Sequence, residues 1–475
     1  MPGDDARELL ALAICPACRH EERLEPVSRN VLHCPHCDAR FPLIHCGNVD
    51  IPWLFADPYS TCVEWKARYN GFLHRNAAEQ QRLKRALSNH EISRTAKRRI
   101  TRLLRARTQH REQVTRLVAP LELESIEWPP DMADVLQSKL PKNQGLSSYY
   151  DNVFRDWAWD NGENEAVFDV VADALQAARR DHVGATLTLG AGACRLPFDV
   201  HRGLRPSLSV VLDFNPLLLH VASHVVQGYA VPLYEFPVAP LNEASFAVLQ
   251  ECRAPSGFSG EGFADFHFVF ADALEPPFAR HSFDTVITPW FIDIIPRDLR
   301  DFLPHLNRLL VEGGIWVNSG SLAFFHKDES WCYSEEEVLD LVEQSGFELL
   351  AADRKTIPYL QSPHSAHGRT ENVLTFAARK IDDVAHAASR PYLPEWVLDI
   401  SRPVPRSAGS AVSSSRHLLK AQILALTDGK RTIDDIGCLI AEQYGLGLME
   451  SIHAVRRILI DFYEDADPTD TASII

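Results

Sequence analysis

The stretch ATLTLGAGACR, residues 185–195, decides the fold of this chain. Its apolar first half predicts a buried strand, and Gly190 and Gly192 directly after it predict a sharp turn that lets the backbone approach a ligand. A helix N-terminus is expected just beyond the turn, where backbone N–H groups favour anionic ligand groups. The turn alone is weak evidence, because it also fits a dinucleotide enzyme or an ordinary loop.

The order of the segments after this turn separates these alternatives. A second strand over residues 209–212 ends at Asp213, a carboxylate that can accept hydrogen bonds from both hydroxyls of a ribose. A third strand over residues 266–270 is followed by Asp272 and Ala273, where a carboxylate can meet an adenine amino group. For both carboxylates, a plain role in the core or as a cap is the alternative.

A fourth strand over residues 283–288 is followed by a helix, the pair Gly313-Gly314 and a further strand over residues 315–318. Strands that alternate with helices predict an α/β fold with a mostly parallel sheet. This order of features is typical of class I methyltransferases, which bind S-adenosyl-L-methionine, and nicotinamide enzymes lack it. We therefore expect a Rossmann-like sheet of about seven strands within residues 146–380.

Composition and patterning divide the 475 residues into several segments. The expected segments are a zinc ribbon over 1–56, a basic helical segment over 57–145, the methyltransferase domain over 146–380, a linker over 381–417, a small helical or winged-helix domain over 418–466 and an acidic tail over 467–475. The linker is predicted by a Pro- and Ser-rich run that begins at Ser401.

Bulk properties restrict the possible partners and the compartment. The net charge of −16 argues against indiscriminate binding of nucleic acid. No apolar run is long enough to span a bilayer, and the acidic N-terminus does not read as a secretory signal. We expect a cytoplasmic protein without a membrane partner.

Four cysteines near the N-terminus have the spacing of metal ligands. Cys15 and Cys18 form one C-x₂-C pair, and Cys34 and Cys37 form a second. Two such pairs offer four thiolates to one tetrahedral Zn²⁺, in a closed structural site without a position for a catalytic water. A nearby histidine or Cys46 in place of one thiolate is the main alternative assignment.

A longer resemblance runs through the central domain. Its motifs are VFRDW over 153–157, GAGACRL over 190–196, PWFID over 289–293 and GGIWVNSG over 313–320, followed by Phe325-His326. In this order they resemble the motifs of the carnosine N-methyltransferase family, and the likeness covers most of residues 146–380. Cys194 stands where the family turn has its third glycine, and Asp213 stands where the family has glutamate.

This resemblance implies roles for individual residues. The residues implied to bind the cofactor are Asn152, Arg155, Gly190, Gly192, Arg195, Asp213, Asp272 and Ala273. Asp293 and His326 are implied to face an acceptor imidazole. The tyrosine cluster of the family is replaced around residues 367–370, which leaves Tyr359 as the nearby candidate for binding the acceptor.

The chemistry of Asp293 fits this role independently. Methyl transfer from a sulfonium is an in-line displacement, so positioning supplies much of the acceleration. A neutral imidazole nitrogen is already nucleophilic, and a carboxylate just past the fourth strand can accept the opposite N–H and orient the ring. Asp293 is therefore the expected catalytic residue, with capping of a nearby helix as the alternative. His326 either contacts the acceptor or is a loop histidine without a role.

A basic stretch between Arg82 and Arg116 has apolar residues at helical spacing. It predicts two amphipathic helices with an arginine-rich outer face. A phosphate- or RNA-binding surface is one interpretation. A solvated face, partly neutralised by acidic domains, is the other and is favoured.

Both ends of the chain resemble known modules. The runs LHCPHC over 32–37 and FPL over 41–43 resemble small zinc-ribbon proteins that activate tRNA and protein methyltransferases, which implies docking. Near the C-terminus, a D-G turn at 428–429 and a helix capped by Thr432 resemble PqqD-like peptide-binding modules. That resemblance implies a protein or leader-peptide partner, and a purely structural or dimerising module is equally open.

Three functions follow from these features. The first is an S-adenosyl-L-methionine-dependent N-methyltransferase that acts on a nitrogen, such as an imidazole, of a histidine-derived small molecule or peptide. The second is a tRNA or protein methyltransferase that docks its substrate through the zinc ribbon and the basic helices; the run TPWF over 288–291 lacks the amide–Pro–Pro–aromatic motif of exocyclic-nitrogen methylators. The third is a non-catalytic, cofactor-binding scaffold. The expected cofactors are S-adenosyl-L-methionine and a structural Zn²⁺.

Overall fold

The computed structural model describes residues 4–89, 91–123, 144–178, 182–258, 260, 263, 265–326, 328–385 and 418–465. The chain divides into two compact units, Met1–Ser389 and Arg390–Ile475. Among the described residues, no helix is both long and apolar enough to cross a membrane.

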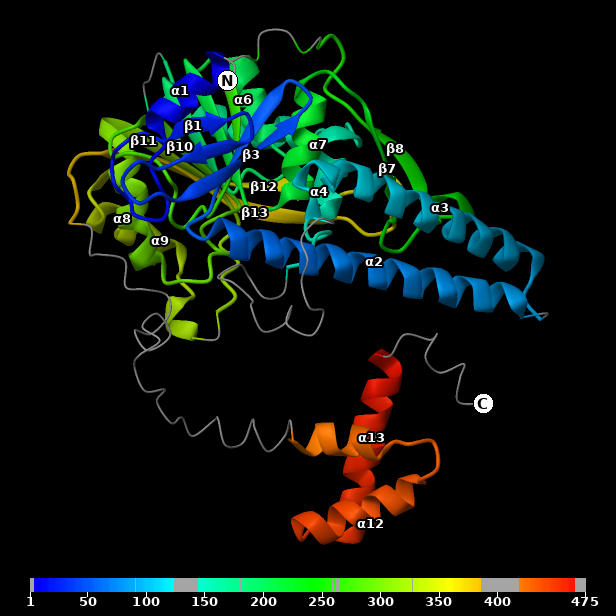
Figure 1. Ribbon diagram of the computed structural model, residues 1–475. Helices are drawn as coiled ribbons and strands as arrows, with labels where there is room; N and C mark the ends of the chain where they lie inside the picture. The colour runs from blue at the N-terminus through cyan, green and yellow to red at the C-terminus, as the bar shows by residue number, and fades with distance from the viewer. Residues whose placement is uncertain are drawn as a thin grey trace. The chain divides into compact units, whose positions relative to one another are not determined.

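An eleven-stranded sheet forms the centre of the first unit (Figure 1). Its strands are β1 (Glu25–Ser28), β2 (Val31–His33), β3 (Arg40–Cys46), β4 (Val49–Leu54), β5 (Ala185–Leu189), β6 (Leu208–Asp213), β9 (Phe266–Ala271), β10 (Phe283–Pro289), β11 (Leu310–Gly320), β12 (Phe347–Tyr359) and β13 (Arg369–Lys380). Across the sheet they lie in the order β1-β2-β3-β4-β9-β6-β5-β10-β11-β13-β12.

The portion from β9 to β12 is the expected Rossmann-like sheet. Strands β9, β6, β5, β10 and β11 are parallel, because each is joined to the next along the chain by a crossover. Strand β13 lies between β11 and β12 and is antiparallel to both. The class I methyltransferase fold is thereby confirmed.

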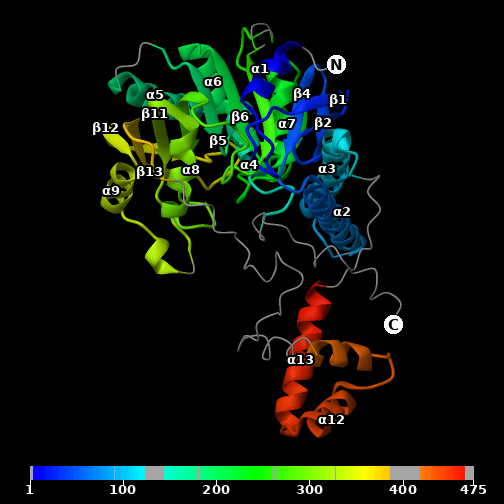
Figure 2. The same cartoon turned by 60° about the vertical axis from the view of Figure 1, so that its left-hand side comes forward.

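Helices cover both faces of this sheet. They are α5 (Glu163–Ala177), α6 (Arg195–Leu204) and α7 (Pro216–Val226) on one face and α8 (Leu299–Leu309) and α9 (Glu335–Gln344) on the other. Ile287 and Val317 pack toward α5, whereas Val286 and Trp316 pack toward α8 and α9. Figure 2 shows strands β11 to β13 between these two layers. Burial on both faces explains why the central strands read as continuous apolar runs.

The sheet continues into the N-terminal segment. Strand β4 pairs in parallel with β9, with Trp53 opposite Phe270, and β1 to β4 extend the sheet as an antiparallel ribbon. Trp53 is fully buried, and its ring lies 5.2 Å from that of Phe270. Helix α1 (Asp4–Leu12) contributes Leu9 and Leu10 to the same core as the central strands. The N-terminal segment therefore shares a core with the methyltransferase sheet, a pairing the sequence did not predict.

Two long helices, α2 (Pro58–Ser88) and α3 (Arg94–Val118), follow the N-terminal strands and lie side by side (Figure 1). In α2, Trp65, Tyr69 and Phe72 recur at spacings of four and three residues and are buried on one face. The first turn past α3 is the 3₁₀ helix η1 (Ala119–Leu121).

A small second sheet lies against α3. It consists of the antiparallel strands β7 (Val231–Glu235) and β8 (Val248–Cys252), joined through the 3₁₀ helix η4 (Glu243–Phe246). Helix α3 contacts both β7 and η4. The sequence did not predict this hairpin, which packs against α3 within the basic stretch.

The described part of the C-terminal unit is helical. A helix over residues 418–426 is followed by α12 (Ile433–Tyr444) and α13 (Leu448–Asp465). Thr432 and Asp435 form a capping box at the start of α12. Ile423, Ile436 and other apolar residues form a small core of their own. No wing strand occurs within residues 418–465, and the predicted tail over 467–475 lies outside the described residues.

Candidate functional site

The glycine turn after β5 opens the site at the carboxyl ends of the parallel strands, where open α/β sheets bind ligands. Gly190 and Gly192 have φ values of 65° and 57°, in the left-handed region that favours glycine. A Cβ at Gly190 would lie 2.6 Å from Cδ2 of Phe291, whereas nothing lies within 4 Å of a Cβ at Gly192. The turn is therefore packed tightly at its first glycine and open at its second.

Asp213 closes the turn from β6. Its Oδ2 accepts a hydrogen bond from the backbone N–H of Gly192 at 2.8 Å, and its Oδ1 accepts one from Asn215 at 2.8 Å. Burial raises the pKa of Asp213 to about 6, against the effect of these N–H donors. Each oxygen keeps a further lone pair, so the carboxylate still fits the two hydroxyls of a ribose. This is the position predicted from the sequence.

The adenine side of the predicted site follows β9. The Oδ1 atom of Asp272 accepts a hydrogen bond from the backbone N–H of Leu274 at 2.9 Å. Ala273 is buried beside it. Both residues lie at the same edge of the sheet as Asp213, because β9 and β6 are parallel neighbours.

Helix α4 (Tyr150–Trp157) carries two further candidates, Asn152 and Arg155. The guanidinium of Arg155 pairs with Asp156 at 2.7 Å and lies 5.4 Å from the ring centre of Tyr359. Burial alone would lower the pKa of Arg155, but the adjacent charge of Asp156 outweighs burial and raises it. Arg155 is therefore a permanent buried cation beside the predicted acceptor tyrosine.

The side chain of Arg195 lies elsewhere. Its Nε donates to Asp199 at 2.7 Å, and its Nη1 donates to the backbone carbonyl of Asp156 at 2.8 Å. It lines a shallow depression with Glu165 and Arg202, apart from the pocket that Asn152 and Tyr359 line. The structure thus places this side chain as a brace between α6 and α4.

Asp293 follows β10 and is 4% exposed. Its Oδ2 accepts a hydrogen bond from the backbone N–H of Ala323 at 3.0 Å, whereas its Oδ1 is buried without a partner. Burial raises the pKa of Asp293 to about 6, with a further contribution from the negative charge of Glu371. A buried carboxylate oxygen without a donor is costly, and the hydroxyl of Ser321 is the nearby side-chain group that lowers the pKa of this carboxyl.

His326 lies in the loop that follows β11. Its ring centre is 5.6 Å from that of Trp331 and 6.3 Å from that of Phe324. The same loop is tied to Asp293 through the N–H of Ala323. Neither His326 nor Asp293 lines the pocket described next.

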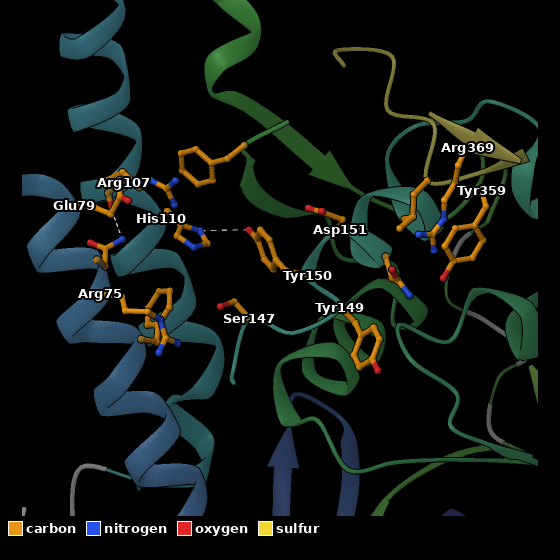
Figure 3. A pocket seen from close by; sticks show the side chains of 15 residues that line it. Arg75, Glu79, Arg107, His110, Ser147, Tyr149, Tyr150, Asp151, Tyr359 and Arg369 are labelled. Atoms are coloured by element: carbon orange, nitrogen blue, oxygen red, sulfur yellow. Dashed lines mark hydrogen bonds between the residues drawn. The ribbon is translucent and has the colours of Figure 1, made fainter. Parts of the chain in front are cut away.

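A pocket of about 580 Å³ adjoins the sheet edge and is walled by α2, α3, α4 and the β12–β13 hairpin. Figure 3 shows Arg75 and Arg107 on the helix side and Tyr359 and Arg369 on the opposite side. The ring of Tyr359 has Arg369 at 4.5 Å on one side, and the ring of Trp290 packs against it at 5.3 Å. Cations, aromatic rings and the carboxylates of Glu79 and Asp151 thus line an opening large enough for more than an imidazole.

Burial affects two residues of α3 that line this pocket, Arg107 and His110. The guanidinium of Arg107 lies 3.7 Å from the ring centre of Phe236, and its Nε is buried without a hydrogen-bond partner. Burial lowers the pKa of His110 to about 4, so its ring is neutral at physiological pH. Its Nδ1 lies 3.3 Å from the hydroxyl of Tyr150, which donates to the carbonyl of Tyr234.

Tyr149 lines the pocket and lies near enough to Asp213 and Asp293 for their charges to affect its pKa. Its φ of 59° is left-handed, and its hydroxyl accepts a hydrogen bond from Gln144 at 3.1 Å. Burial raises the pKa of Tyr149, and the charges of Asp213 and Asp293 add to this. Left-handed conformations also occur at Cys194, Trp290 and Leu360. Strained backbone of this kind concentrates at functional sites.

Sequence reasoning missed the helix-borne part of this pocket. Arg107 belongs to the basic stretch between Arg82 and Arg116 that we interpreted as carrying an outer face, whereas Arg75 precedes that stretch. Helical periodicity identifies which side of α2 and α3 is apolar, but not which element covers it. The left-handed Tyr149 carried no signal, because tyrosine gives no hint of a positive φ.

The four predicted zinc ligands converge on one point. The sulfur atoms of Cys15, Cys18, Cys34 and Cys37 all lie within 4.8 Å of one another. Cys46 lies elsewhere, with its Sγ 2.7 Å from Nδ1 of His220. The donor set is therefore four thiolates, which fits a closed tetrahedral Zn²⁺ site.

Strand order, glycine turn and strand-end carboxylates together define a class I S-adenosyl-L-methionine-dependent methyltransferase. The family model of carnosine N-methyltransferases matches residues 133–382, which is more than half of the chain. The chain belongs to this family.

Individual proteins are similar to parts of this chain. Carnosine N-methyltransferase unmet of Drosophila melanogaster is 26% identical over 287 residues, which cover 55% of this chain and 60% of the relative. A putative methyltransferase of Bacillus halodurans is 13% identical, with a TM-score of 0.31, over 45% of this chain and 99% of that one. A chain from the complex of the Haloferax volcanii Trm112 methyltransferase activator with a putative methyltransferase is also 13% identical, with a TM-score of 0.29, over 47% and 95%.

Proposed function

We propose that the protein is an N-methyltransferase that transfers a methyl group to an imidazole nitrogen of a histidine-derived small molecule or peptide. The observation that carries this proposal is the buried, unpartnered Oδ1 of Asp293 at the carboxyl end of β10. A group that donates one N–H and presents a second nitrogen with a lone pair fits such an atom, and a neutral imidazole has both features.

The donor side is built from the turn and the neighbouring strand ends. S-Adenosyl-L-methionine, when bound, supplies a methyl group on a sulfonium. The open space over Gly192 accommodates the amino-acid part, Asp213 binds the ribose, and Asp272 with Ala273 borders the adenine. We propose that Asn152 and Arg155 of α4 also contact the donor, because the buried cation of Arg155 suits its carboxylate. For Arg195, we propose a contribution through its backbone, since its side chain is bound to Asp199.

On the acceptor side, Asp293 fixes the ring and receives the proton. Its Oδ1 accepts the N–H of the imidazole, which leaves the other nitrogen as the nucleophile. When that nitrogen gains the methyl group the ring becomes cationic, and the N–H proton can pass to the carboxylate. A pKa of about 6 suits this exchange near neutral pH. We propose that His326 also contacts the acceptor, because the N–H of Ala323 holds the loop that carries His326 to Asp293.

The pocket beyond Tyr149 defines the rest of the acceptor. Its volume of about 580 Å³ exceeds what an imidazole requires, and it presents the guanidinium groups of Arg75, Arg107 and Arg369. Tyr359 offers a ring face between the cations of Arg155 and Arg369. We therefore propose that the acceptor carries a carboxylate at the end away from the imidazole.

Transfer of a labelled methyl group from S-adenosyl-L-methionine to a panel of acceptors tests this proposal. The panel contains imidazole, histidine, histidine dipeptides with a free and with an amidated carboxyl end, histidine-containing peptides and bulk tRNA. We expect transfer to the histidine compounds and a loss of at least tenfold on amidation. Labelling confined to tRNA would overturn the proposal in favour of a tRNA methyltransferase. Binding of S-adenosylhomocysteine without transfer to any acceptor would favour a scaffold.

We further propose that the four-cysteine cluster holds a structural Zn²⁺ and that the C-terminal unit contacts a protein or leader peptide. The cluster lies next to the core, because Cys15 and Cys34 are fully buried there. In the C-terminal unit, Tyr444, Leu446 and Met449 are exposed apolar side chains. Removal of residues 418–475 should leave transfer to small acceptors unchanged and weaken transfer to a peptide partner.

A further inference from the structure

We propose that the protein binds a single-stranded nucleic acid along helix α3, in a groove separate from the methyl-acceptor pocket. This α3 groove has a volume of about 600 Å³. The cations that line it are Arg94, Lys97, Arg98, Arg102 and Arg105 of α3. The opposite wall comes from the β7–β8 hairpin and η4. No residue lines both this groove and the acceptor pocket, so the inference does not depend on the proposed reaction.

The charge of the groove is not neutralised by its surroundings. Glu243 is the only carboxylate among the lining residues, and it already pairs with Arg98 at 2.9 Å. The remaining four cations are exposed and form no ion pair within the described part of the chain. By contrast, the inward-facing Arg99 and Arg107 of α3 lie over the rings of Phe246 and Phe236. A protein of net charge −16 therefore concentrates unpaired cations at one place, which favours a local polyanion.

The spacing of the cations follows one line along the helix. The four unpaired cations, at positions 94, 97, 102 and 105, are three, five and three residues apart and so lie on one side of α3. With a rise of about 1.5 Å per residue, this stripe is roughly 16 Å long. Phosphates in one strand of a B-form helix are about 3.4 Å apart along the axis and lie further apart in a stretched strand. The stripe can therefore contact several consecutive phosphates.

The other wall of the groove suits bases rather than a bare phosphate polymer. It presents Tyr234, Ala247 and Leu249, and Leu249 is 52% exposed. Figure 1 shows α3 running beside β7 and β8, and α3 contacts β7 and η4, which contribute to the opposite wall. Proteins that bind single strands combine a cationic groove along the backbone with aromatic side chains on which bases stack, and here Tyr234 is the aromatic side chain of the apolar wall.

Fluorescence anisotropy with labelled 15-nucleotide oligo(U) and oligo(dT) tests this inference on the full-length protein. Each phosphate contact in a single strand contributes roughly 0.7 to the slope of log affinity against log salt. Four contacts therefore predict a slope near −3 between 50 and 200 mM salt, by the same relation. The combined substitutions Arg94→Gln, Lys97→Gln, Arg102→Gln and Arg105→Gln should reduce affinity at least tenfold and bring the slope close to zero.

The matched control removes the same charge from other exposed positions. It combines Arg29→Gln, Arg40→Gln, Arg280→Gln and Lys355→Gln, and should retain the affinity and slope of the unaltered protein. A second variant, Leu249→Glu, should weaken oligonucleotide binding more than binding of inorganic tripolyphosphate. The inference is wrong if the unaltered protein does not bind either oligonucleotide at 50 mM salt, if the control variant loses as much affinity as the groove variant, or if a duplex of equal length binds as tightly as the single strand.

Discussion

Replacing each glycine of the cofactor turn by alanine separates packing from ligand binding. Both glycines have a left-handed φ, so each alanine carries a backbone cost of about 1–2 kcal/mol. At Gly190 the added Cβ also meets Phe291 at 2.6 Å. That ring is buried and packs against Phe302 at 5.5 Å, so it has little freedom to move away. Overpacking of this kind costs a further 1–3 kcal/mol, roughly.

The two variants should therefore lose different properties: Gly190→Ala mainly stability, and Gly192→Ala mainly ligand affinity. Gly190→Ala should lower the free energy of unfolding by about 2–5 kcal/mol, and Gly192→Ala by only about 1–2 kcal/mol. Gly192→Ala fills the open space over the turn. It should therefore weaken S-adenosylhomocysteine binding at least tenfold, which is about 1.4 kcal/mol, while the protein remains folded.

Urea unfolding and isothermal titration calorimetry measure the two effects. The double variant Gly190→Ala/Phe291→Ala should recover part of the stability relative to the sum of the single changes, because the ring that causes the clash is removed. Equal stability of the two single variants, or unchanged ligand affinity in Gly192→Ala, would refute this account of the turn.

Three further predictions concern charge and metal. At saturating donor, transfer should rise as the pH increases through about 6, because Asp293 must be ionised to accept the N–H and the acceptor imidazole, which titrates near about 6.5, must be neutral. Below both values the rate should therefore fall with the loss of two ionisations, and in the Asn variant with the loss of one; equal slopes in the two proteins would assign the limb to the acceptor alone. Arg155→Ala should lower the free energy of unfolding in urea by about 3–5 kcal/mol, since Asp156 is left buried without its charged partner. Arg155→Lys should retain most of the stability. A loss below about 1 kcal/mol in Arg155→Ala would contradict the pairing. Purified protein should contain about one Zn²⁺ per chain. Cys34→Ser should lower Tm and release the metal, whereas the exposed Cys332→Ser should do neither. An unchanged Tm after metal removal would exclude a structural role.

The central sheet was predictable because its signals are local. The glycine turn, Asp213 at the end of β6 and the Gly313-Gly314 pair before the main part of β11 each mark a boundary within a few residues. Their order, with long connections between successive strands, then predicts which strands are parallel, since parallel strands need a crossover connection. The same reasoning placed Asp213, Asp272 and Asp293 after strands at one edge of the sheet, where the structure has them.

The extension of the sheet was not predictable for the opposite reason. Trp53 and Phe270 pair across a long separation in sequence, and nothing in either segment names its partner. The same holds for Arg75 and Arg107, which line the pocket from helices whose periodicity gave only an apolar and a basic side. The resemblance indicated Arg195 as a cofactor residue, but its side chain is bound to Asp199 one turn further along α6. Long-range packing decides such cases, and local patterns do not record it.

The rate of methyl transfer by Asp293→Asn, measured alongside its affinity for S-adenosylhomocysteine, tests the central claim most directly. Asparagine keeps the size of the side chain and can still accept the N–H of Ala323, but it cannot receive a proton. We predict that kcat/KM for the best histidine-derived acceptor falls by roughly 10²–10⁴-fold, with the Kd of S-adenosylhomocysteine unchanged within about twofold. Transfer at the unaltered rate, or an equal loss of S-adenosylhomocysteine affinity, would contradict the role of Asp293 as the residue that holds the acceptor.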